Sequence, residues 1–434
     1  MSFKKKHVII LGAGITGLTT SYFLNKFKIR NTIIEKENKP GGLLKSFKIK
    51  NFIFDNFIHI SHAKNPFVKN FFKKSSSYFK LEPRPNNLYK DTWIDHSPQF
   101  NLYPLPLSEK IKIIFSYLAR NRKKNFRQKN YENWLKGAYG EYFAKKFPMQ
   151  YTKKYWATKS KNLGTNWVKF RMQEISLIDL IKGAFFKIYK GTYYSDDMKY
   201  PKKGGYESFL SILKNNKNII YNSKLKKIDI NKKKIFLSNK ILSYSNLVST
   251  IPLTEFIDLT NNKNEKLKIC RKKLRCTAGL IVSIGLNCLT NLRTWFYIYN
   301  KDFQAARIYC PKKLSKNNCP PNKSSLQAEI FFDNKKKIDS NLIKSIKKNT
   351  INQLINYKII DKKNIEFVDV RFNKYANIIF DKNYGKTKKY IMSYYKKFNI
   401  DFIGRFGSWA YLWSDQCFLS GKATAKKIYM EHKK

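Results

Sequence analysis

The chain has 434 residues, of which 87 are Lys or Arg and 29 are Asp or Glu, so its formal net charge is +58. This length accommodates two or three domains. Hydrophobic residues make up 42% of the chain and occur as short runs along all of it, which excludes an intrinsically disordered protein. With 18 Gly and 13 Pro, a collagen-like or linker protein is also excluded.

The positive charge is spread along the whole sequence. Lysines occur in every segment together with many Asn, Ile, Phe and Tyr, which is typical of a compositional bias. We interpret the charge as a solvated cationic surface; the alternative is that it attracts an anionic substrate. The basic residues do not form a stripe with interleaved stacking aromatics, so no nucleic-acid partner is expected. Peripheral contact with a membrane stays open.

The cysteines, the histidines and the lengths of the apolar runs indicate the cellular compartment and whether a metal site or a membrane span is expected. The six cysteines form no C-x-x-C pair and the start carries no secretory signal, so we expect reduced thiols and a cytoplasmic protein. The five histidines form no H-E-x-x-H motif, so no metal site is expected. Runs of about 18 apolar residues, as a membrane span requires, are absent from the sequence.

A βαβ pattern opens the chain. A strand over residues 7–11 runs into Gly12-x-Gly14-x-x-Gly17, which begins a helix, and the next strand ends at Glu35. The three glycines permit a tight turn, close approach of a pyrophosphate and close packing of helix on strand. The helix N-terminus attracts phosphate, and the acid is placed to accept hydrogen bonds from a ribose. The pattern predicts a bound dinucleotide; the alternative is an ordinary glycine turn and a surface glutamate.

Hydrophobic periodicity predicts the remaining elements. Helices are expected over residues 107–118, 131–147, 207–213, 338–357 and 418–430. Strands are expected as a meander within 219–249 and over 281–286, 295–299, 327–332 and 401–404. The dinucleotide-binding elements therefore lie at both ends of the chain, with a large insertion between them.

Two further motifs favour FAD over NAD as the dinucleotide. Gly41 and Gly42 follow the acid, and Phe54-Asp55-x-x-x-His59 comes soon after. These resemble the second glycine pair and the F-D-x-G-x-H element of the flavoproteins that include amine oxidases, protoporphyrinogen oxidase, phytoene desaturase and UDP-galactopyranose mutase. Residues 200–205 and 248–252 also resemble recurring elements of that group.

Within this group, the chain resembles UDP-galactopyranose mutase. The resemblance rests on four segments spread over most of the sequence, namely 58–62, 151–171, 295–299 with Arg307, and 404–411. It implies an α/β fold with a Rossmann-type FAD-binding domain, a mixed-sheet substrate domain and a helical insertion. We place the FAD domain at 1–85, 200–260 and 395–434, the mostly helical cap at 86–199 and the mixed-sheet domain at 261–394.

The resemblance also implies the residues of the site. The expected cofactor-binding residues are Gly12, Gly14, Ile15, Thr16, Gly17, Glu35, Lys36, Gly41, Gly42, Leu43, His59, Gly404, Arg405, Asp415, Gln416 and Phe418. The expected substrate-binding residues are Trp156, Trp167, Arg171, Arg307, Tyr375 and Tyr411. His59, Arg171 and Arg307 are the expected catalytic residues: the histidine lies against the flavin, and the arginines bind the substrate diphosphate.

The implied reaction is the isomerisation of a UDP sugar between pyranose and furanose forms, for surface polysaccharide biosynthesis. In that mechanism N5 of the reduced flavin attacks the anomeric carbon and UDP leaves, so NAD(P)H or another reductant is an expected partner. Two departures stand out: Ile58 occupies a position where the mutases have Gly or Pro, and Asn377 one where a tyrosine is more frequent. The alternative is an FAD-dependent oxidoreductase of the amine oxidase, protoporphyrinogen oxidase or desaturase type.

Overall fold

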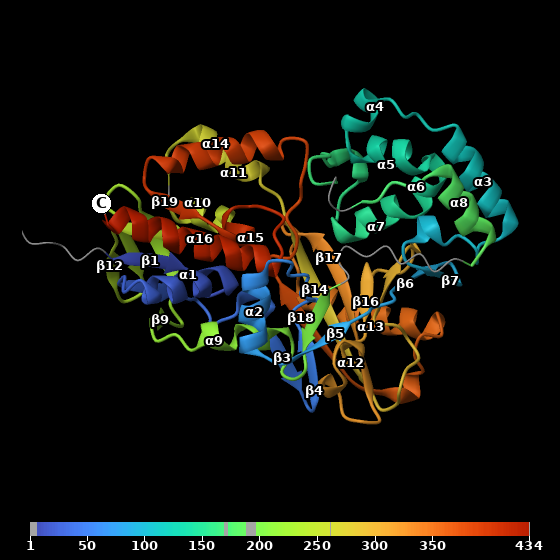
Figure 1. The fold of residues 1–434 in the computed structure, drawn as a ribbon, viewed down its shortest axis with the longest axis horizontal. Coiled ribbons are helices and arrows are strands. Elements are labelled where there is room, and N and C mark those ends of the chain that lie inside the picture. Colours follow the sequence, from blue (N-terminus) through green and yellow to red (C-terminus); the bar gives the residue numbers. More distant parts are fainter. Residues whose placement is uncertain (1–6, 169–171, 188–196, 261, 434) are drawn as a thin grey trace, which may run out of the picture.

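The structure, a computed structural model, describes residues 7–168, 172–187, 197–260 and 262–433. Figure 1 shows a layer of parallel strands and helices in the left half of the molecule, a mixed sheet at lower right and a group of helices at upper right. The helix nearest the C-terminus lies along the helix nearest the N-terminus. The predicted α/β class, with a Rossmann-type domain, a mixed sheet and a helical group, is confirmed.

A five-stranded parallel sheet forms the Rossmann-type layer. Its strands, in spatial order, are β19 (Ile400–Phe402), β13 (Asn246–Ser249), β1 (Val8–Leu11), β2 (Asn31–Ile34) and β9 (Ile219–Ile220). All neighbours run parallel, and every residue of the central strand β1 is buried. A continuous apolar strand such as Val-Ile-Ile-Leu suits this position because helices cover both faces of a parallel sheet.

Helices from the two ends of the chain cover one face of this sheet together. α1 (Ile15–Lys26) packs along α16 (Ser414–Lys433). Phe27 stacks on Tyr429 with ring centres 4.5 Å apart, and the ring of Phe418 meets that of Phe23 edge-on. The aromatic contacts bury the seam between elements almost 400 positions apart in sequence, so the first and last segments belong to the same layer.

A seven-stranded mixed sheet forms the second layer. Its order is β18 (Ile365–Asn373), β14 (Thr277–Leu286), β17 (Ser324–Asp333), β16 (Arg307–Tyr309), β15 (Trp295–Ile298), β6 (Asn86–Tyr89) and β7 (Thr92–Asp95). Only the β15–β6 pair is parallel. β6 and β7 come from the segment expected to form the helical cap, so that segment also extends the sheet. α13 (Ser340–Asn356) packs against β18.

Six short helices form the group at upper right in Figure 1. They are α3 (Leu107–Leu118), α4 (Lys124–Gln128), α5 (Tyr131–Tyr139), α6 (Glu141–Lys146), α7 (Pro148–Tyr155) and α8 (Leu177–Phe185). The stretch 131–147 is helical, as predicted, but it divides into two helices: Gly140 has φ of +81° and ends α5. A Cβ there would lie 2.6 Å from the Ser116 carbonyl carbon, so the break lets the chain pass close to α3.

The remaining elements connect these layers. They are β3 (Ser46–Ile49), β4 (Phe52–Asp55), α2 (Pro66–Ser75), β5 (Tyr78–Leu81), β8 (Met198–Pro201), α9 (Ser211–Lys214), β10 (Leu225–Asp229), β11 (Lys234–Leu237), β12 (Ile241–Ser243), α10 (Leu253–Leu259), α11 (Glu265–Lys273), α12 (Pro311–Leu314), α14 (Tyr384–Lys396) and α15 (Gly404–Gly407). The helix expected over 207–213 is a 3₁₀ turn followed by α9. α11 and α14 pack on each other, and α14 packs on β19, so both belong spatially to the Rossmann-type layer. In sequence, α11 and all but the last two residues of α14 lie within 261–394.

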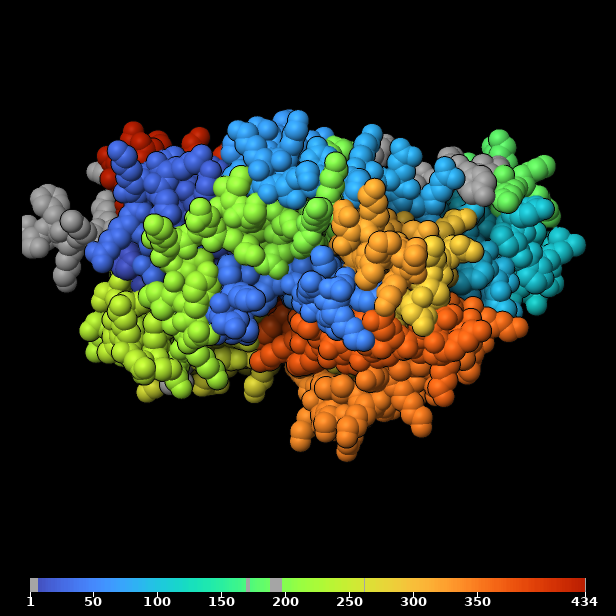
Figure 2. Space-filling view, turned by 90° about the horizontal axis from the view of Figure 1, so that it is seen from below, coloured from blue at the N-terminus to red at the C-terminus, as the bar shows by residue number. Residues whose placement is uncertain are grey.

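The two layers are in direct contact. Figure 2 shows blue segments from near the N-terminus lying against orange segments from the second half of the chain. One such contact joins the Phe52 ring of β4 to the Phe367 ring of β18, with ring centres 5.1 Å apart. Within the described residues, every helix is too short or too polar to cross a bilayer.

Candidate active site

A cavity of about 1220 Å³ lies between the Rossmann-type layer and the mixed sheet. At one end its wall is the turn after β1, with Gly12 and Gly14. At the other end it reaches Trp156 and Trp167 beside the helical group. A cavity of this size can hold more than one drug-sized molecule, so a cofactor and a substrate can share it.

The glycine turn after β1 forms a cradle for phosphate. Gly12 has φ of +94°, and a Cβ on Gly17 would lie 2.0 Å from the Gly12 carbonyl oxygen, so the helix can approach the turn only without side chains there. α1 starts with Gly14 as its N-cap, with no side-chain cap and no acid in the first turn. Its first N–H groups, at Ile15 and Thr16 on the cavity wall, are therefore available to an anion.

Glu35 closes the cradle at the end of β2. Its carboxylate accepts hydrogen bonds from the N–H of Ala13, at 2.7 Å, and of Glu37, at 3.0 Å. Each carboxylate oxygen keeps a lone pair for a further donor, such as a ribose hydroxyl. Gly41 donates to the Ala13 carbonyl at 2.8 Å, which brings the second glycine pair against the first. The cradle fits a dinucleotide on its own geometry.

On the opposite side of the cavity, Arg307 is paired with a buried acid. Its Nε and Nη2 donate to Oε2 of Glu329 at 3.0 and 2.6 Å, and the two residues are partners in the β16–β17 ladder. Glu329 is fully buried, and its other oxygen accepts from the Ile58 N–H at 2.7 Å. Burial lowers the pKa of Arg307, but the neighbouring carboxylate outweighs it and the pKa lies well above its usual value. The arginine stays charged, while Glu329 cancels its net charge.

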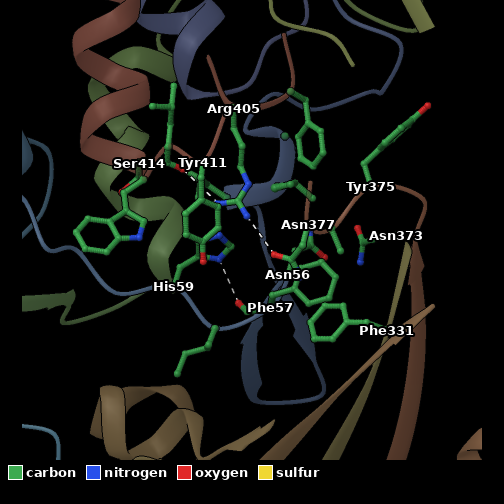
Figure 3. A pocket seen from close by; sticks show the side chains of 18 of the residues that line it. Asn56, Phe57, His59, Phe331, Asn373, Tyr375, Asn377, Arg405, Tyr411 and Ser414 are labelled. Carbon is green, nitrogen blue, oxygen red and sulfur yellow. Dashed lines mark hydrogen bonds between the residues drawn. The ribbon is translucent and has the colours of Figure 1, made fainter. Parts of the chain in front are cut away.

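Arg405 has no such partner. Its Nη1 donates to the Leu412 carbonyl at 3.2 Å and its Nη2 to Oδ1 of Asn377 at 3.1 Å, while its buried Nε has no partner among the described residues. None of the ion pairs among the described residues involves Arg405. Figure 3 shows its guanidinium beside Tyr411, whose ring centre lies 4.9 Å from the guanidinium carbon. Arg405 is therefore a cavity-lining cation whose charge no carboxylate cancels.

His59 is neutral in this setting. Burial lowers its pKa to about 4, the Phe57 carbonyl opposes that shift, and the charges of Arg405 and Arg307 add to it. Nδ1 lies 3.2 Å from the Phe57 oxygen, an acceptor, so Nδ1 carries the proton and Nε2 is left as an acceptor. Figure 3 shows the ring facing the same space as Tyr411.

The loop that carries His59 is held by packing. Phe57 has φ of +63°, and its ring stacks on Phe331 with centres 5.6 Å apart. A Cβ on Gly279 of β14 would lie 2.6 Å from that ring, so the glycine makes room for it. The hydrogen bond from Ile58 to Glu329 fixes the next residue. Phe57 therefore adopts the left-handed backbone conformation that makes the turn in this loop. The next residue, Ile58, occupies the position where the mutases have glycine or proline.

Aromatic side chains line the end of the cavity under the helical group. Trp156 lies between Trp167 and Tyr411, with ring centres 5.3 and 6.0 Å away. Tyr155 donates to Oδ1 of Asn377 at 3.0 Å, the atom that also accepts from Arg405. The departure at Asn377 therefore has a role: one amide oxygen joins a tyrosine of α7 to the arginine.

A buried lysine fixes α7 above the mixed sheet. Lys154 donates to the carbonyls of Ile298 at 3.0 Å, Asn300 at 2.6 Å and Ala305 at 3.4 Å. Burial lowers its pKa to about 7. The three carbonyls hold the helix in the register that places Tyr151 and Tyr155 over Arg307.

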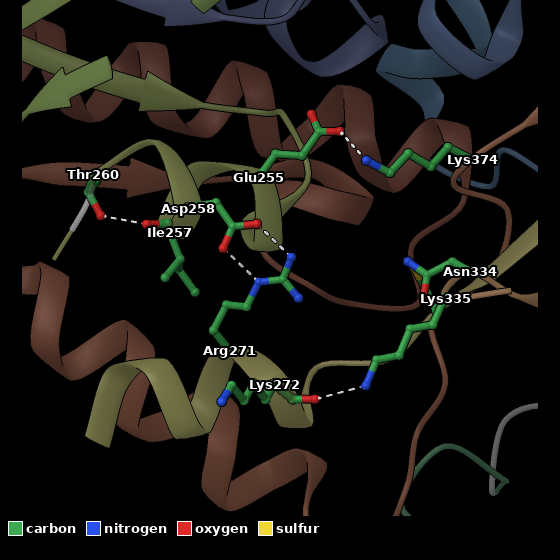
Figure 4. Close-up of polar contacts among 10 residues, drawn as sticks. Glu255, Ile257, Asp258, Thr260, Arg271, Lys272, Asn334, Lys335 and Lys374 are labelled. Atoms are coloured by element: carbon green, nitrogen blue, oxygen red, sulfur yellow. Dashed lines mark hydrogen bonds and ion pairs between the residues drawn. The ribbon is translucent and has the colours of Figure 1, made fainter. Parts of the chain in front are cut away.

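Acids of α10 line the edge of the cavity near β18. Asp258 is held by Nε and Nη2 of Arg271 at 2.8 and 2.5 Å, and Glu255 lies 3.6 Å from Lys374 (Figure 4). Tyr375 packs on Phe406, and Figure 3 shows its ring directed away from Tyr411. Its pKa is raised by burial and by the charge of Glu255, so it faces this edge and not the tryptophans.

The structure brings most of the expected site residues together. Those on the cavity wall are Gly12, Gly14, Ile15, Thr16, Glu35, Lys36, Gly41, Gly42, Leu43, His59, Trp156, Trp167, Arg307, Tyr375, Arg405 and Tyr411. Gly17, Gly404, Asp415, Gln416 and Phe418 are not on it. Phe418 is fully buried in an aromatic cluster with Phe71 and Phe72, because its side chain faces the core and not the cavity. Arg171 lies outside the described residues.

Sequence reasoning missed Glu329, Tyr151, Tyr155 and Tyr297. Glu329 had a visible signal: it is a lone acid within the apolar stretch 326–332 of a strand expected to be buried. A buried acid in such a strand needs a cationic partner, which is Arg307. Tyr297 precedes Arg307 on the facing strand of the same ladder, and only the pairing of β15 with β16 brings them together. The described residues contain no group of three His, Cys, Asp or Glu able to hold a metal ion.

Comparisons with known proteins agree with this architecture. Residues 10–75 match the model of the NAD(P)-binding Rossmann-like domain family. A reduced UDP-galactopyranose mutase superposes with a TM-score of 0.91 at 20% identity, over 98% of this chain and 96% of that one. A putrescine oxidase double mutant redesigned in cofactor binding gives 0.66 at 11% identity, over 98% and 99% of the two chains.

A third similar structure is an oxidoreductase from Methanosarcina mazei, with a TM-score of 0.62 at 13% identity, over 97% of this chain and all of that one. No curated protein matches the chain in sequence. At such low identities the likeness establishes the fold. The resemblance predicted from the sequence is thereby confirmed at the level of the fold: this chain has the fold of UDP-galactopyranose mutase, and the putrescine oxidase shares its general architecture.

Proposed function

We propose that this protein binds FAD and isomerises a nucleotide-linked sugar between its pyranose and furanose forms, in the biosynthesis of a surface polysaccharide. The cradle at Gly12–x–Gly14 and Glu35 would hold the FAD diphosphate and ribose, and the other end of the same cavity would hold the sugar nucleotide. Both ligands then share one cavity, as a reaction carried by the cofactor requires.

The observation that carries this proposal is the charge of Arg405. It lines the cavity, its buried Nε has no partner among the described residues, and no carboxylate cancels its charge. A half-buried cation of this kind, with one fully buried donor left unpaired, costs free energy unless an anion joins it. A diphosphate satisfies it with charge-assisted hydrogen bonds, which strengthen as the leaving UDP gains charge. An amine substrate would be repelled by the same charge.

The neighbouring residues suit the same chemistry. Bound reduced FAD would supply the nucleophile for the anomeric carbon. His59, neutral and with Nε2 as an acceptor, would hold a hydrogen bond to the ring system without adding a charge. Tyr411 adds a neutral donor beside Arg405, and Trp156 with Trp167 exclude water from the sugar.

The second candidate is an FAD-dependent oxidoreductase, and one observation favours it. Arg307, expected as a diphosphate ligand, already gives Nε and Nη2 to Glu329. One of the cations expected to bind the UDP diphosphate thus brings no net charge. An oxidoreductase acting on an uncharged substrate has less need of a diphosphate-binding cation at Arg307 or at Arg405.

The experiment that decides between them uses the purified, flavin-loaded protein. Reduced with dithionite, it is incubated with a panel of UDP-hexoses, and ring-contracted products are sought by NMR. In parallel, the oxidised protein is given amines and other reduced substrates while oxygen consumption is followed. Ring contraction that is lost in Arg405→Ala and kept in the surface control Arg30→Ala supports the mutase. Oxygen consumption without any ring contraction overturns it.

A further inference from the structure

Helix α3 has two apolar faces, and only one of them is covered by protein. Ile113 and Tyr117 point into the core and are buried. Leu107, Ile111, Phe115 and Leu118 recur at helical spacing and are all exposed. Positions separated by three or four residues share one side of a helix. The outer face of α3 is therefore a continuous apolar stripe in solvent.

Helix α8 repeats this arrangement beside it. Leu180 and Ala184 are buried, whereas Ile178, Ile181 and Phe185 are exposed, followed by exposed Phe186. α3 and α8 are in contact, and Figure 1 places both on the outer right-hand edge of the molecule. We call the eight exposed side chains of the two helices the apolar platform: Leu107, Ile111, Phe115, Leu118, Ile178, Ile181, Phe185 and Phe186.

The apolar platform is too exposed for a freely solvated surface. Leu107 is 60% exposed, Phe115 69% and Ile178 65%. Single exposed apolar residues are ordinary on proteins, but a contiguous group rimmed by polar residues marks an interaction surface. The two helices bury one face against the core already, so the second face needs a different partner.

Basic residues flank the platform along the chain. The sequence from 103 to 129 holds eight Lys or Arg, at 110, 112, 120, 122, 123, 124, 127 and 129, against one acid, Glu109. That acid is buried and pairs with Lys90 at 2.8 Å. Lys112, Arg122, Lys123, Lys124 and Lys129 are exposed.

One lysine shows how the rim and the platform fit together. Lys110 reaches from α3 across to α8, where its Nζ lies 5.8 Å from the Phe185 ring centre and 5.2 Å from that of Tyr103. Its stem covers apolar surface while its ammonium stays at the edge, as lysines do at an interface. Next to it, a pocket of about 270 Å³ is lined by Trp93, Tyr103 and Phe186. Tryptophan and tyrosine are the side chains enriched where apolar and polar phases meet.

We propose that the apolar platform docks this protein on the surface of an anionic lipid bilayer. An amphipathic helix with Leu, Ile and Phe on one side and Lys and Arg around it lies in the plane of the headgroups, with its apolar face among the acyl chains. The rim at Arg122, Lys123 and Lys124 then meets the lipid phosphates. The proposal is independent of the reaction at the cavity.

The charge of the rim argues against a second copy of the chain as the occupant. In a two-fold symmetric dimer the same patch faces itself, so the rim at 122–124 would approach an equally basic rim. The sequence 110–129 holds no acid that could pair across such an interface. The acids near the platform are already engaged within one copy: Glu174 pairs with Arg127, and Asp179 of α8 accepts a hydrogen bond from Ser176. A bilayer offers the opposite charge together with an apolar phase.

The test measures co-sedimentation of the full-length protein with vesicles of phosphatidylcholine containing phosphatidylglycerol, beside vesicles of phosphatidylcholine alone. The double variant Phe115→Ser with Ile178→Ser is compared with Ile269→Ser and Leu289→Ser, which are exposed elsewhere. Arg122→Glu, Lys123→Glu and Lys124→Glu together are compared with Lys232→Glu, Lys234→Glu and Lys240→Glu, which change the net charge equally.

We expect both platform variants to bind the anionic vesicles about tenfold more weakly than the parent protein, and both controls to bind as the parent does. Equal weakening in the lysine control would show diffuse attraction by the overall charge and overturn the proposal. So would an absence of binding to either vesicle, or a dimer in sedimentation equilibrium that Phe115→Ser with Ile178→Ser converts to monomer.

Discussion

The cradle is built from one stretch of chain, residues 8–42, whereas the opposite wall of the cavity takes residues from segments far apart in sequence. In the cradle, backbone N–H groups and glycines shape the surface, and Glu35 is the one acid that closes it. In the opposite wall, side chains from α7, β16 and β17 carry buried charges and phenols.

The two regions depend on different physics. The cradle depends on close approach of backbone, so added volume should damage it most. The opposite wall depends on the balance of buried charges, so an unpaired ion should damage it most. Substitutions in each region can separate these two dependences.

The largest expected effect is the removal of Glu329. Glu329→Leu leaves Arg307 buried without its partner, which should lower the free energy of unfolding by about 3–5 kcal/mol. The added change Arg307→Met should recover most of that loss, because it removes the orphaned charge. Urea unfolding of the single and double variants measures this.

The matched control for Glu329→Leu is Glu265→Leu, which breaks the exposed pair with Lys268. Such surface pairs contribute little, so its unfolding curve should stay near the parent's. If the double variant of Glu329→Leu with Arg307→Met is as unstable as Glu329→Leu alone, the loss of stability does not come from the unpaired charge of Arg307.

The cradle is tested by added volume. Gly17→Ala places a Cβ 2.0 Å from the Gly12 carbonyl oxygen, so α1 must move away from the turn. We expect a loss of about 3 kcal/mol in the free energy of unfolding and a protein purified with little flavin. Gly385→Ala on α14 is the control, because its Cβ meets nothing within 4 Å. Equal flavin content in the two variants would contradict the assignment of the cradle.

What the sequence could predict follows the same division. The cradle is local, so the spacing of Gly12, Gly14 and Gly17 with Glu35 was enough to place it. Arg307 and Tyr411 were placed only by resemblance to the mutase. The pairing of Arg307 with Glu329 depends on the β16–β17 register, and the shared contact of Arg405 and Tyr155 depends on side chains of three separate segments. Neither leaves a periodic signal in the sequence.

The elements themselves show the same limit. Helix 107–118 was predicted with both ends correct, because its apolar spacing is local. The helix expected over 131–147 divides at Gly140, where the backbone of α3 passes too close for a side chain. The extension of the mixed sheet by β6 and β7 depends on their pairing with β15, some 200 residues away.

The next effect is a pH dependence of stability from His59. Its pKa is lowered by burial to about 4, from 6.5. Above pH 6.5 both states are neutral; between 6.5 and 4 the unfolded chain binds the proton first, so stability falls as the pH falls. At a pH of about 5 this amounts to about 2 kcal/mol. Urea unfolding of the parent and of His59→Gln at several pH values measures it.

Two other groups act in the same window and appear in both proteins. His96, whose pKa is also lowered to about 4 by burial, adds to the loss of stability at low pH. Asp55, whose pKa is raised to about 6 by burial, opposes it, since the folded state binds its proton first. The contributions of His96 and Asp55 cancel when the free energy of unfolding of His59→Gln is subtracted from that of the parent. If this difference in the free energy of unfolding is the same at pH 7 and pH 5, His59 is not held neutral by burial.

The smallest expected effect concerns the two arginines. Glu329 cancels the charge of Arg307, but no carboxylate among the described residues cancels that of Arg405. The oxidised holoprotein should therefore lose more UDP affinity with Arg405→Gln than with the double change of Arg307→Gln and Glu329→Gln, which removes the pair without orphaning the acid. We expect about tenfold for Arg405→Gln, or about 1.4 kcal/mol, and unchanged affinity for the surface control Arg30→Gln. Titration calorimetry measures this, with flavin content checked in each variant so that loss of cofactor is not counted as loss of UDP. Equal losses for Arg405→Gln and for the double variant would mean that Arg307 leaves Glu329 to meet the diphosphate, so that the ion pair is a resting arrangement which the ligand opens.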